Sequence, residues 1–230
     1  MKLKFLNYII TSLLFLVSVA SAQTCKSNQY DMLQWMAPQS STYNGHYNMV
    51  YPVSGVFYWV KSAEGFPWDV DLFDANYIYQ SITEQNWNDP TTYKVFRPAL
   101  RWMPRCVTKP TSYRKLSSIL LAPSQTMFEI HSSCTSYTTH SLGYVVNELW
   151  GPAQRTIAGR TLETLTLVYK YSCDSNHNNC KYREDFSMQA GLGLSQWTYY
   201  TLQNGVYKQV NQTTHGAISL GSVNPVHPCW

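Results

Sequence analysis

The sequence predicts a mainly β protein: an antiparallel sheet or β-sandwich with a C-terminal four-stranded meander and a few short helices. Three observations predict this fold class. Apolar and polar residues alternate over several stretches of the C-terminal half, which is the pattern of half-buried strands. Aromatic residues make up 15% of the chain, and they favour strands. Asn204-Gly205 separates two alternating stretches, and this pair is preferred in two-residue hairpin turns.

Residues 1–22 have the features of a secretory signal peptide. Lys2 and Lys4 precede the apolar segment 5–19, and residues 20–22 are the small residues that signal peptidase accepts. The apolar segment is about 15 residues long, shorter than the roughly 20 needed to span a bilayer. We therefore expect a secreted or extracytoplasmic protein, periplasmic in a Gram-negative host, with no membrane span after cleavage.

Residues 23–230 are predicted to form a single disulfide-stabilised, β-rich domain, because this length can bury a sizeable core. Without the two signal-peptide lysines the formal charge falls from +4 to +2, and no basic run is present. Proteins that bind nucleic acid usually gather Lys and Arg into a patch. No nucleic-acid partner is therefore expected.

The N-terminal half is expected to mix strands with short helices. Asp is a common N-cap residue, and Pro is favoured in the first helical turn. The expected helices are a segment capped by Asp74 with Ile78 and Ile82 on one side, a segment from Asp89-Pro90 to Phe96, and a segment containing Tyr113, Leu116 and Leu120; the expected strands are 53–60, 127–131 and 142–150.

The C-terminal meander is expected to have strands at 164–172, 181–189 and 194–202, with a fourth after Gly205. A two-residue turn at Asn204-Gly205 sets the register of the last pair. This register places Leu202 opposite Tyr207 and Tyr200 opposite Gln209. The face assigned to the core holds Trp197, Tyr199, Val206 and Val210, and the face assigned to solvent holds Gln196, Thr198, Tyr200, Tyr207, Gln209, Asn211 and Thr213.

The even number of cysteines in an exported chain predicts disulfides. Cys173–Cys180 is the pair that the sequence favours, because it closes a polar loop between two predicted strands. The further pairs Cys106–Cys134 and Cys25–Cys229 are guesses. Zinc is the competing interpretation, but the chain has no CxxC and no paired histidines at ligand spacing. Neither a metal nor a cofactor is therefore predicted.

The segment 61–74 is rich in carboxylates, contains Trp68 and lies close to Trp59 in the sequence. Glu64, Asp69 and Asp71 are the candidate catalytic residues, since positions 69 and 71 share a face if this segment is extended. Two carboxylates beside aromatic rings suit sugar hydrolysis. Calcium binding, contact with a ligand, or simple hydration of an edge strand are the alternatives.

Glu184 is a further residue of interest, because the alternation turns its carboxylate toward the core, on the face of Phe186. A buried carboxylate needs a partner, or its pKa rises. Arg155, Arg160 and Lys170 are the candidate partners. A raised pKa at a ligand pocket is the alternative role.

The function hypothesis that follows is a secreted, non-catalytic binding module with carbohydrate as its ligand. Flat aromatic faces stack on sugar rings while neighbouring polar groups bind hydroxyls. Trp59, Trp68, Tyr200 and Tyr207 are the candidate ligand contacts. A small glycan-acting hydrolase is one alternative, and an extracellular structural or protein-interaction domain is another. The Gly-x-Ser-x-Gly motif that carries a serine nucleophile is absent from the sequence, so serine nucleophile chemistry is not expected.

Overall fold

A computed structural model describes residues 25–36, 47–51, 56–60, 67–85, 92–123, 126–131 and 137–214. Side chains are described for residues 25–36, 73–80, 99–123 and 139–214. The predicted signal peptide lies outside the described residues. Within them, no helix is both long and apolar enough to cross a membrane.

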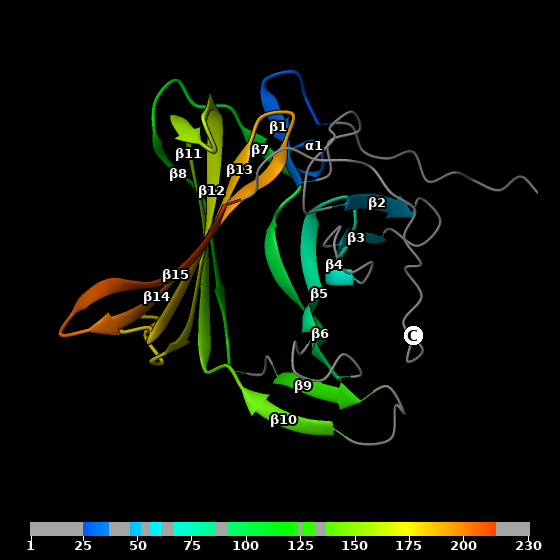
Figure 1. Ribbon diagram of the computed structural model, residues 1–230, viewed down its shortest axis with the longest axis vertical. Helices are drawn as coiled ribbons and strands as arrows, with labels where there is room; N and C mark the ends of the chain where they lie inside the picture. Colours follow the sequence, from blue (N-terminus) through cyan, green and yellow to red (C-terminus); the bar gives the residue numbers. More distant parts are fainter. Residues whose placement is uncertain are drawn as a thin grey trace, which may run out of the picture.

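The described residues are mostly β-strand, as predicted, and the only helix among them is a single short turn (Figure 1). The elements in chain order are β1 (Gln29–Asp31), α1 (Met32–Met36), β2 (Tyr47–Tyr51), β3 (Val56–Val60), β4 (Pro67–Phe73), β5 (Tyr77–Gln85), β6 (Thr92–Pro104), β7 (Cys106–Thr108), β8 (Arg114–Leu121), β9 (Thr126–His131), β10 (Tyr137–Ser141), β11 (Tyr144–Ile157), β12 (Arg160–Cys173), β13 (Tyr182–Gln189), β14 (Gly193–Gln203) and β15 (Val206–Thr214).

Two large antiparallel sheets organise these strands. One has seven strands in the order β10-β9-β6-β5-β4-β3-β2, and the other has six in the order β15-β14-β13-β12-β11-β8. A small sheet pairs β1 with β7. In Figure 1 the six-stranded sheet lies on the left and the seven-stranded sheet on the right, with β1, α1 and β7 near the top.

The core lies between the two large sheets. Leu149, Leu165 and Phe186 from the six-stranded sheet join Ile78 and Leu100 from the seven-stranded sheet in one buried cluster, to which α1 also contributes. The two sheets therefore pack face to face around apolar side chains, which is the predicted sandwich arrangement.

A hydrogen bond also links the two sheets directly. Asn147 on β11 is 1% exposed, and its Nδ2 donates to the backbone carbonyl oxygen of Arg101 on β6 at 2.7 Å. A buried polar side chain needs such a partner. This bond therefore fixes how β11 sits against β6.

The C-terminal meander β12–β13–β14–β15 is confirmed, with Leu202 opposite Tyr207 and Tyr200 opposite Gln209. The core assignment of Val206 and Val210 is wrong, because these side chains are 62% and 58% exposed. The β14–β15 hairpin extends beyond the body of the molecule (Figure 1), so its tip has no opposing sheet.

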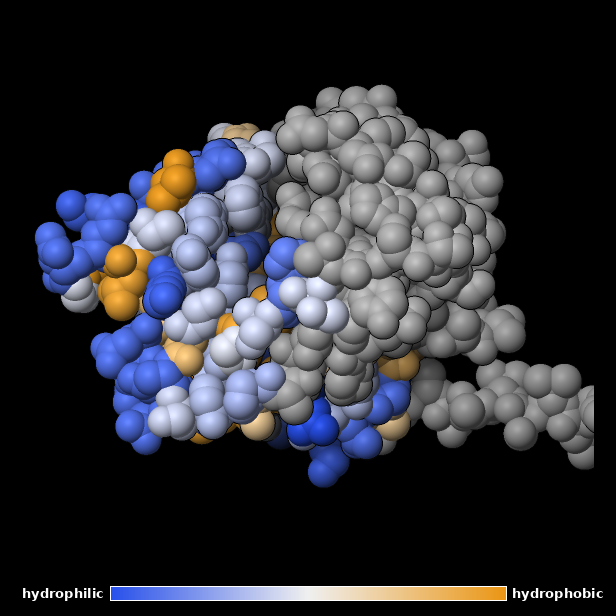
Figure 2. Space-filling view, turned by 90° about the horizontal axis from the view of Figure 1, so that it is seen from below, coloured by the Kyte–Doolittle hydropathy of each residue, from blue (hydrophilic) through white to orange (hydrophobic). Residues whose placement is uncertain are grey.

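A register shift near Tyr199 also moves two residues of β15 to the face opposite the predicted one. Asn211 lies opposite Tyr199 and Thr213 opposite Trp197, whereas both were assigned to the solvent face with Tyr200. An extra residue in one strand reverses the facing of the residues that follow. The hairpin end seen in Figure 2 is largely hydrophilic with a few hydrophobic residues.

The three helices expected in the N-terminal half are wrong. Ile78 and Ile82 lie in strand β5, Phe96 lies in β6, and Leu116 and Leu120 lie in β8. The strands expected at 53–60 and 127–131 are confirmed where the structure describes them, as β3 and β9, and the strand expected at 142–150 is confirmed from Tyr144, where β11 begins.

Two disulfides are present among the described residues. Cys173–Cys180 joins the end of β12 to the loop before β13, as predicted. Cys25 bonds to Cys106, so the guessed pairs Cys106–Cys134 and Cys25–Cys229 are both wrong. Cys25 precedes β1 and Cys106 begins β7, and the strand pairing between these elements brings the two cysteines together. Cys134 and Cys229 lie outside the described residues.

Candidate functional site

The candidate site lies on the outer face of the six-stranded sheet, the face that carries Glu148, Val168 and Asp185 and points away from the core. Glu148 lies opposite Val168, and Val168 lies opposite Asp185. Directly paired residues of antiparallel strands project to the same side. Alternate residues of β11, β12 and β13 therefore form one continuous surface.

An irregularity in β11 extends this surface. The pairing between β11 and β12 shifts between Trp150 and Ala153, where Gly151 has φ 147°. Gly151 and Pro152 together lie opposite Leu165, so β11 has one extra residue here, and Trp150 and Ala153 both face outward. A Cβ at Gly151 would lie 2.5 Å from Leu165 Cδ2 and 3.1 Å from the Thr164 carbonyl oxygen, and the positive φ disfavours other residues, so a side chain here would strain the structure.

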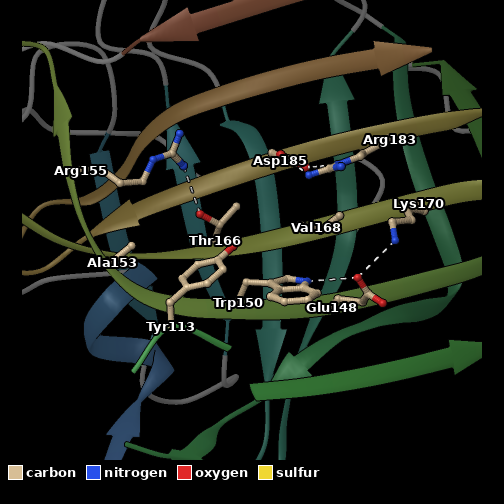
Figure 3. A pocket seen from close by; sticks show the side chains of 10 residues that line it. All are labelled: Tyr113, Glu148, Trp150, Ala153, Arg155, Thr166, Val168, Lys170, Arg183 and Asp185. Atoms are coloured by element: carbon tan, nitrogen blue, oxygen red, sulfur yellow. Dashed lines mark hydrogen bonds and ion pairs between the residues drawn. The ribbon is translucent and has the colours of Figure 1, made fainter. Parts of the chain in front are cut away.

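The outer face is hollowed over these strands (Figure 3). The cavity has a volume of about 620 Å³, within the range of small-molecule sites. We call it the outer-face hollow, and its lining residues are Tyr113, Glu148, Trp150, Ala153, Arg155, Thr166, Val168, Lys170, Arg183 and Asp185.

An aromatic pair forms one side of the outer-face hollow. The rings of Tyr113 and Trp150 are stacked, with centroids 5.8 Å apart and planes 25° from parallel. Tyr113 is 60% exposed, and Trp150 Nε1 donates to Glu148 Oε2 at 3.1 Å. A flat, accessible aromatic surface therefore stands beside a fixed carboxylate.

Glu148 is held by two lysines as well as by the indole of Trp150. Its Oε2 lies 3.2 Å from Lys170 Nζ and its Oε1 lies 3.4 Å from Lys115 Nζ. Partial burial acts to raise the pKa of Glu148, but the bond from Trp150 and the two lysines outweigh it and lower the pKa. Glu148 is therefore ionised at neutral pH and a poor proton donor.

Arg183 and Asp185 form a second fixed group. Arg183 Nε and Nη2 donate to the two oxygens of Asp185 at 2.7 and 2.8 Å, a bidentate geometry that orients both side chains. The guanidinium also lies over the rings of Tyr200 and Tyr207, at 5.1 and 5.7 Å from their centroids. The Tyr207 hydroxyl donates to the Cys180 carbonyl at 2.8 Å.

Arg155 lies on the other side of the outer-face hollow and is held by hydroxyl groups. Its Nη1 donates to Ser187 Oγ at 2.9 Å and to Thr166 Oγ1 at 3.4 Å. Among the side chains that the structure describes, no carboxylate forms an ion pair with Arg155. Arg155 therefore brings a positive charge that no described acidic side chain compensates.

The four predicted ligand contacts are divided between the two large sheets. Tyr200 and Tyr207 lie on β14 and β15 beside the outer-face hollow, but each has one ring face against Arg183. Trp59 and Trp68 belong to β3 and β4 of the seven-stranded sheet, and their side chains lie outside the described set.

The candidate catalytic acids lie in the seven-stranded sheet or in undescribed chain. Positions 69 and 71 are in strand β4, opposite Trp59 and Phe57, so their extended conformation is confirmed. The side chains of Asp69 and Asp71, and the whole of Glu64, lie outside the described residues. The catalytic hypothesis for these acids stays a prediction.

Glu184 is on the inner face, as its alternation predicts, and two aromatic side chains are hydrogen-bonded to it. Trp197 Nε1 donates to Glu184 Oε2 at 2.7 Å, and the Tyr171 side chain is hydrogen-bonded to the same carboxylate. Burial and the charge of Glu184 together raise the pKa of Tyr171. Arg155 and Lys170, two of the expected partners, line the outer-face hollow instead.

Sequence analysis did not identify Tyr113 and Trp150 as site residues. It also did not predict that Arg155 faces outward into the site. Trp150 ends a predicted strand two residues after Glu148, which would have placed the two on one face. Tyr113 comes next to Trp150 only through the pairing of β8 with β11. That long-range pairing has no signal in the local sequence.

Comparison with known proteins gives no match: no family model, curated protein or solved structure is similar to this chain. Within the described residues, no group of three or more His, Cys, Asp and Glu side chains is placed to hold a metal ion. The geometry of the outer-face hollow is therefore the basis for a functional proposal.

Proposed function

We propose that the protein is a non-catalytic binding domain that holds a carbohydrate in the outer-face hollow. The observation that carries this proposal is the stacked pair of Tyr113 and Trp150 beside the fixed carboxylate of Glu148. Aromatic faces pack against the apolar side of a sugar ring, and oriented polar groups bind its hydroxyls.

The polar groups of the outer-face hollow suit this role because they are held in place before a ligand arrives. Asp185 is fixed by Arg183 and Glu148 by Lys170, and Thr166 offers a hydroxyl on the strand between them. Side chains that are already ordered lose little conformational entropy on binding. Carboxylate oxygens accept hydrogen bonds from sugar hydroxyls.

Binding without hydrolysis fits the state of the two carboxylates in the outer-face hollow. Hydrolysis needs a protonated carboxyl group as the acid. The lowered pKa of Glu148 opposes that role, and Asp185 is engaged through both oxygens by Arg183.

The two disulfides support an extracytoplasmic location, because such bonds persist mainly in oxidising compartments. A secreted protein meets polysaccharides of cell surfaces and of the surrounding matrix. The predicted signal peptide would deliver the domain to that location.

The test is a depletion assay of the purified protein against a panel of insoluble and immobilised polysaccharides, with released reducing sugar measured in each supernatant. We expect binding without release. Trp150→Ala and Tyr113→Ala should each weaken binding at least about tenfold, which corresponds to about 1.4 kcal/mol. Tyr77→Ala, in the seven-stranded sheet, is the matched aromatic control and should bind normally.

Two results would overturn the proposal. Binding that is lost in Trp59→Ala or Trp68→Ala but kept in Trp150→Ala would place the site on the other sheet. Release of sugar that Asp69→Asn or Asp71→Asn abolishes would establish the hydrolase instead.

A further inference from the structure

The charges around the outer-face hollow do not balance. Its lining holds the cations Arg155, Lys170 and Arg183 but only two carboxylates, Glu148 and Asp185. Lys115 adds a further positive charge at 3.4 Å from Glu148. The excess positive charge therefore favours a ligand that carries negative charge.

Among the residues that line the outer-face hollow, the excess positive charge lies at one side chain. Lys170 is paired with Glu148, and Arg183 is paired with Asp185 through two hydrogen bonds. Arg155 has only the hydroxyl partners described above, and both contact its Nη1. Of the cations that line the outer-face hollow, it is the one without an acid among the described side chains.

The hydroxyl contacts leave the binding edge of Arg155 available. A guanidinium has five N–H donors, and the described structure places no hydrogen-bond partner at its Nε and Nη2. These two nitrogens form the fork that binds both oxygens of a carboxylate or sulfate. Ser187 and Thr166 limit rotation of the guanidinium, so the fork is oriented in advance.

The position of Arg155 relative to the aromatic pair suggests how one ligand reaches both. Trp150, Ala153 and Arg155 follow one another on the outer face of β11, and Figure 3 shows the small Ala153 between the aromatic pair and Arg155. The short alanine side chain leaves the floor open there. A saccharide ring on Tyr113 and Trp150 would direct its neighbouring unit toward Arg155.

We propose that the ligand of the outer-face hollow is an anionic saccharide whose carboxylate or sulfate group binds Arg155. This inference rests on the proposed carbohydrate-binding function and adds the charge of the ligand to it. The shared chemistry is a planar or tetrahedral oxyanion attached to a sugar unit.

The test compares two matched pairs of polysaccharide: polygalacturonate with its methyl-esterified form, and dextran sulfate with dextran. Binding of the full mature chain is measured by affinity electrophoresis and by calorimetry. The variants are Arg155→Gln, Arg155→Lys and Trp150→Ala. Lys208→Gln is the control for loss of one positive charge, because Lys208 is exposed and pairs with Thr201 rather than with a residue of the outer-face hollow.

We expect the wild type to bind the charged member of at least one pair about 10- to 100-fold more tightly, the range for charge-assisted hydrogen bonds. The preferred pair distinguishes a carboxylate ligand from a sulfate ligand. Arg155→Gln should abolish the preference, Arg155→Lys should keep part of it because Lys binds as a point charge, and Lys208→Gln should leave it intact.

Equal binding of charged and neutral members by the wild type, lost only in Trp150→Ala, would overturn this inference and leave the proposed function standing. A charge preference that Lys208→Gln weakens as much as Arg155→Gln would also overturn it, since the effect would then come from net charge. Binding to none of the four polysaccharides, with no binding in the wider panel, would refute the proposed function and this inference together.

Discussion

Asn147 gives a quantitative test of the way the two large sheets pack. Its buried Nδ2 donates to the Arg101 carbonyl at 2.7 Å. Asn147→Ala removes the donor and leaves that carbonyl without its side-chain partner, which costs about 1–3 kcal/mol. For a protein of this size, each kcal/mol lowers the melting temperature by roughly 2–4 °C. A cost of about 2 kcal/mol therefore predicts a fall of roughly 4–8 °C.

Asn147→Asp gives the same test a pH dependence. The substituted carboxylate would be buried and would face the Arg101 carbonyl oxygen, so burial raises its folded-state pKa above the unfolded value of about 3.9. The protonated acid can donate to that carbonyl, whereas the carboxylate repels it. Asn147→Asp should therefore be less stable than Asn147→Ala at pH 7. The difference in stability between the two variants should shrink as the pH falls toward 4.

The assay is thermal unfolding followed by near-ultraviolet circular dichroism between pH 4 and 8. Asn28→Ala is the control, because Asn28 is exposed and such a surface change alters stability by less than about 0.5 kcal/mol. Identical melting of Asn147→Ala and Asn28→Ala would refute the inter-sheet bond. Parallel pH profiles for the Asp and Ala variants at position 147 would refute the donor geometry.

Three further predictions concern stability. Gly151→Ala should lower the melting temperature more than Gly159→Ala, because both residues have positive φ but only the first would place a Cβ 2.5 Å from a leucine side chain, and calorimetry compares the two. Glu148→Gln should remove stability that the wild type has above pH 4.5, the ordinary pKa of this group, and loses as the pH falls through the lowered pKa of the folded state. Denaturant titrations at pH 3 and pH 7 should therefore differ less in the variant than in the wild type. Arg105→Met should lower the free energy of unfolding in urea by about 3–5 kcal/mol, because it removes the buried guanidinium whose Nε lies 3.7 Å from Asp31 Oδ1. An unchanged midpoint of urea unfolding would contradict this role of Arg105.

The C-terminal strands could be predicted because their local patterns agree with the tertiary structure. Leu165, Leu167 and Tyr169 alternate along β12 and all lie in the core, as do Phe186 and Met188 on β13. Asn204-Gly205 occupies the turn between β14 and β15. The exposure of Val206 could not be predicted this way. Alternation identifies two faces of a hairpin, but it does not reveal whether another element covers either face.

The incorrect helices have a common physical cause. A spacing of four residues, as between Ile78 and Ile82 or Leu116 and Leu120, places both residues on one face of a regular helix and also of a regular strand, since four is close to the helical period and a multiple of two. The spacing alone therefore does not distinguish the two structures. The pairing of β5 and β8 with neighbouring strands settles the conformation.

Asp74 makes the hydrogen bonds expected of a helix-capping residue, but no helix follows it. Its Oδ1 accepts hydrogen bonds from the backbone N–H groups of Asn76 and Tyr77, both at 2.7 Å. This is the bonding expected of a helix N-cap. Here it stabilises the turn between β4 and β5, because Asp side chains form the same bonds in turns.

The candidate site was only partly accessible to sequence analysis. The outward facing of Tyr200 was predicted from the hairpin register, and this residue does lie beside Arg183. The aromatic pair depends on β8 lying next to β11. The charge of Arg155 stands out only once Lys170 and Arg183 are seen to have acids of their own.

The most direct test of the binding site is a heteronuclear NMR titration that follows the indole N–H signals, assigned by single Trp→Phe variants. The titrant is an oligosaccharide of a polysaccharide that the protein binds. We predict that the Trp150 signal shifts with saturation, while that of Trp197, which is hydrogen-bonded to Glu184 on the inner face, stays in place. An unchanged Trp150 signal with a shift at Trp59 or Trp68 would contradict the account and place the site on the seven-stranded sheet.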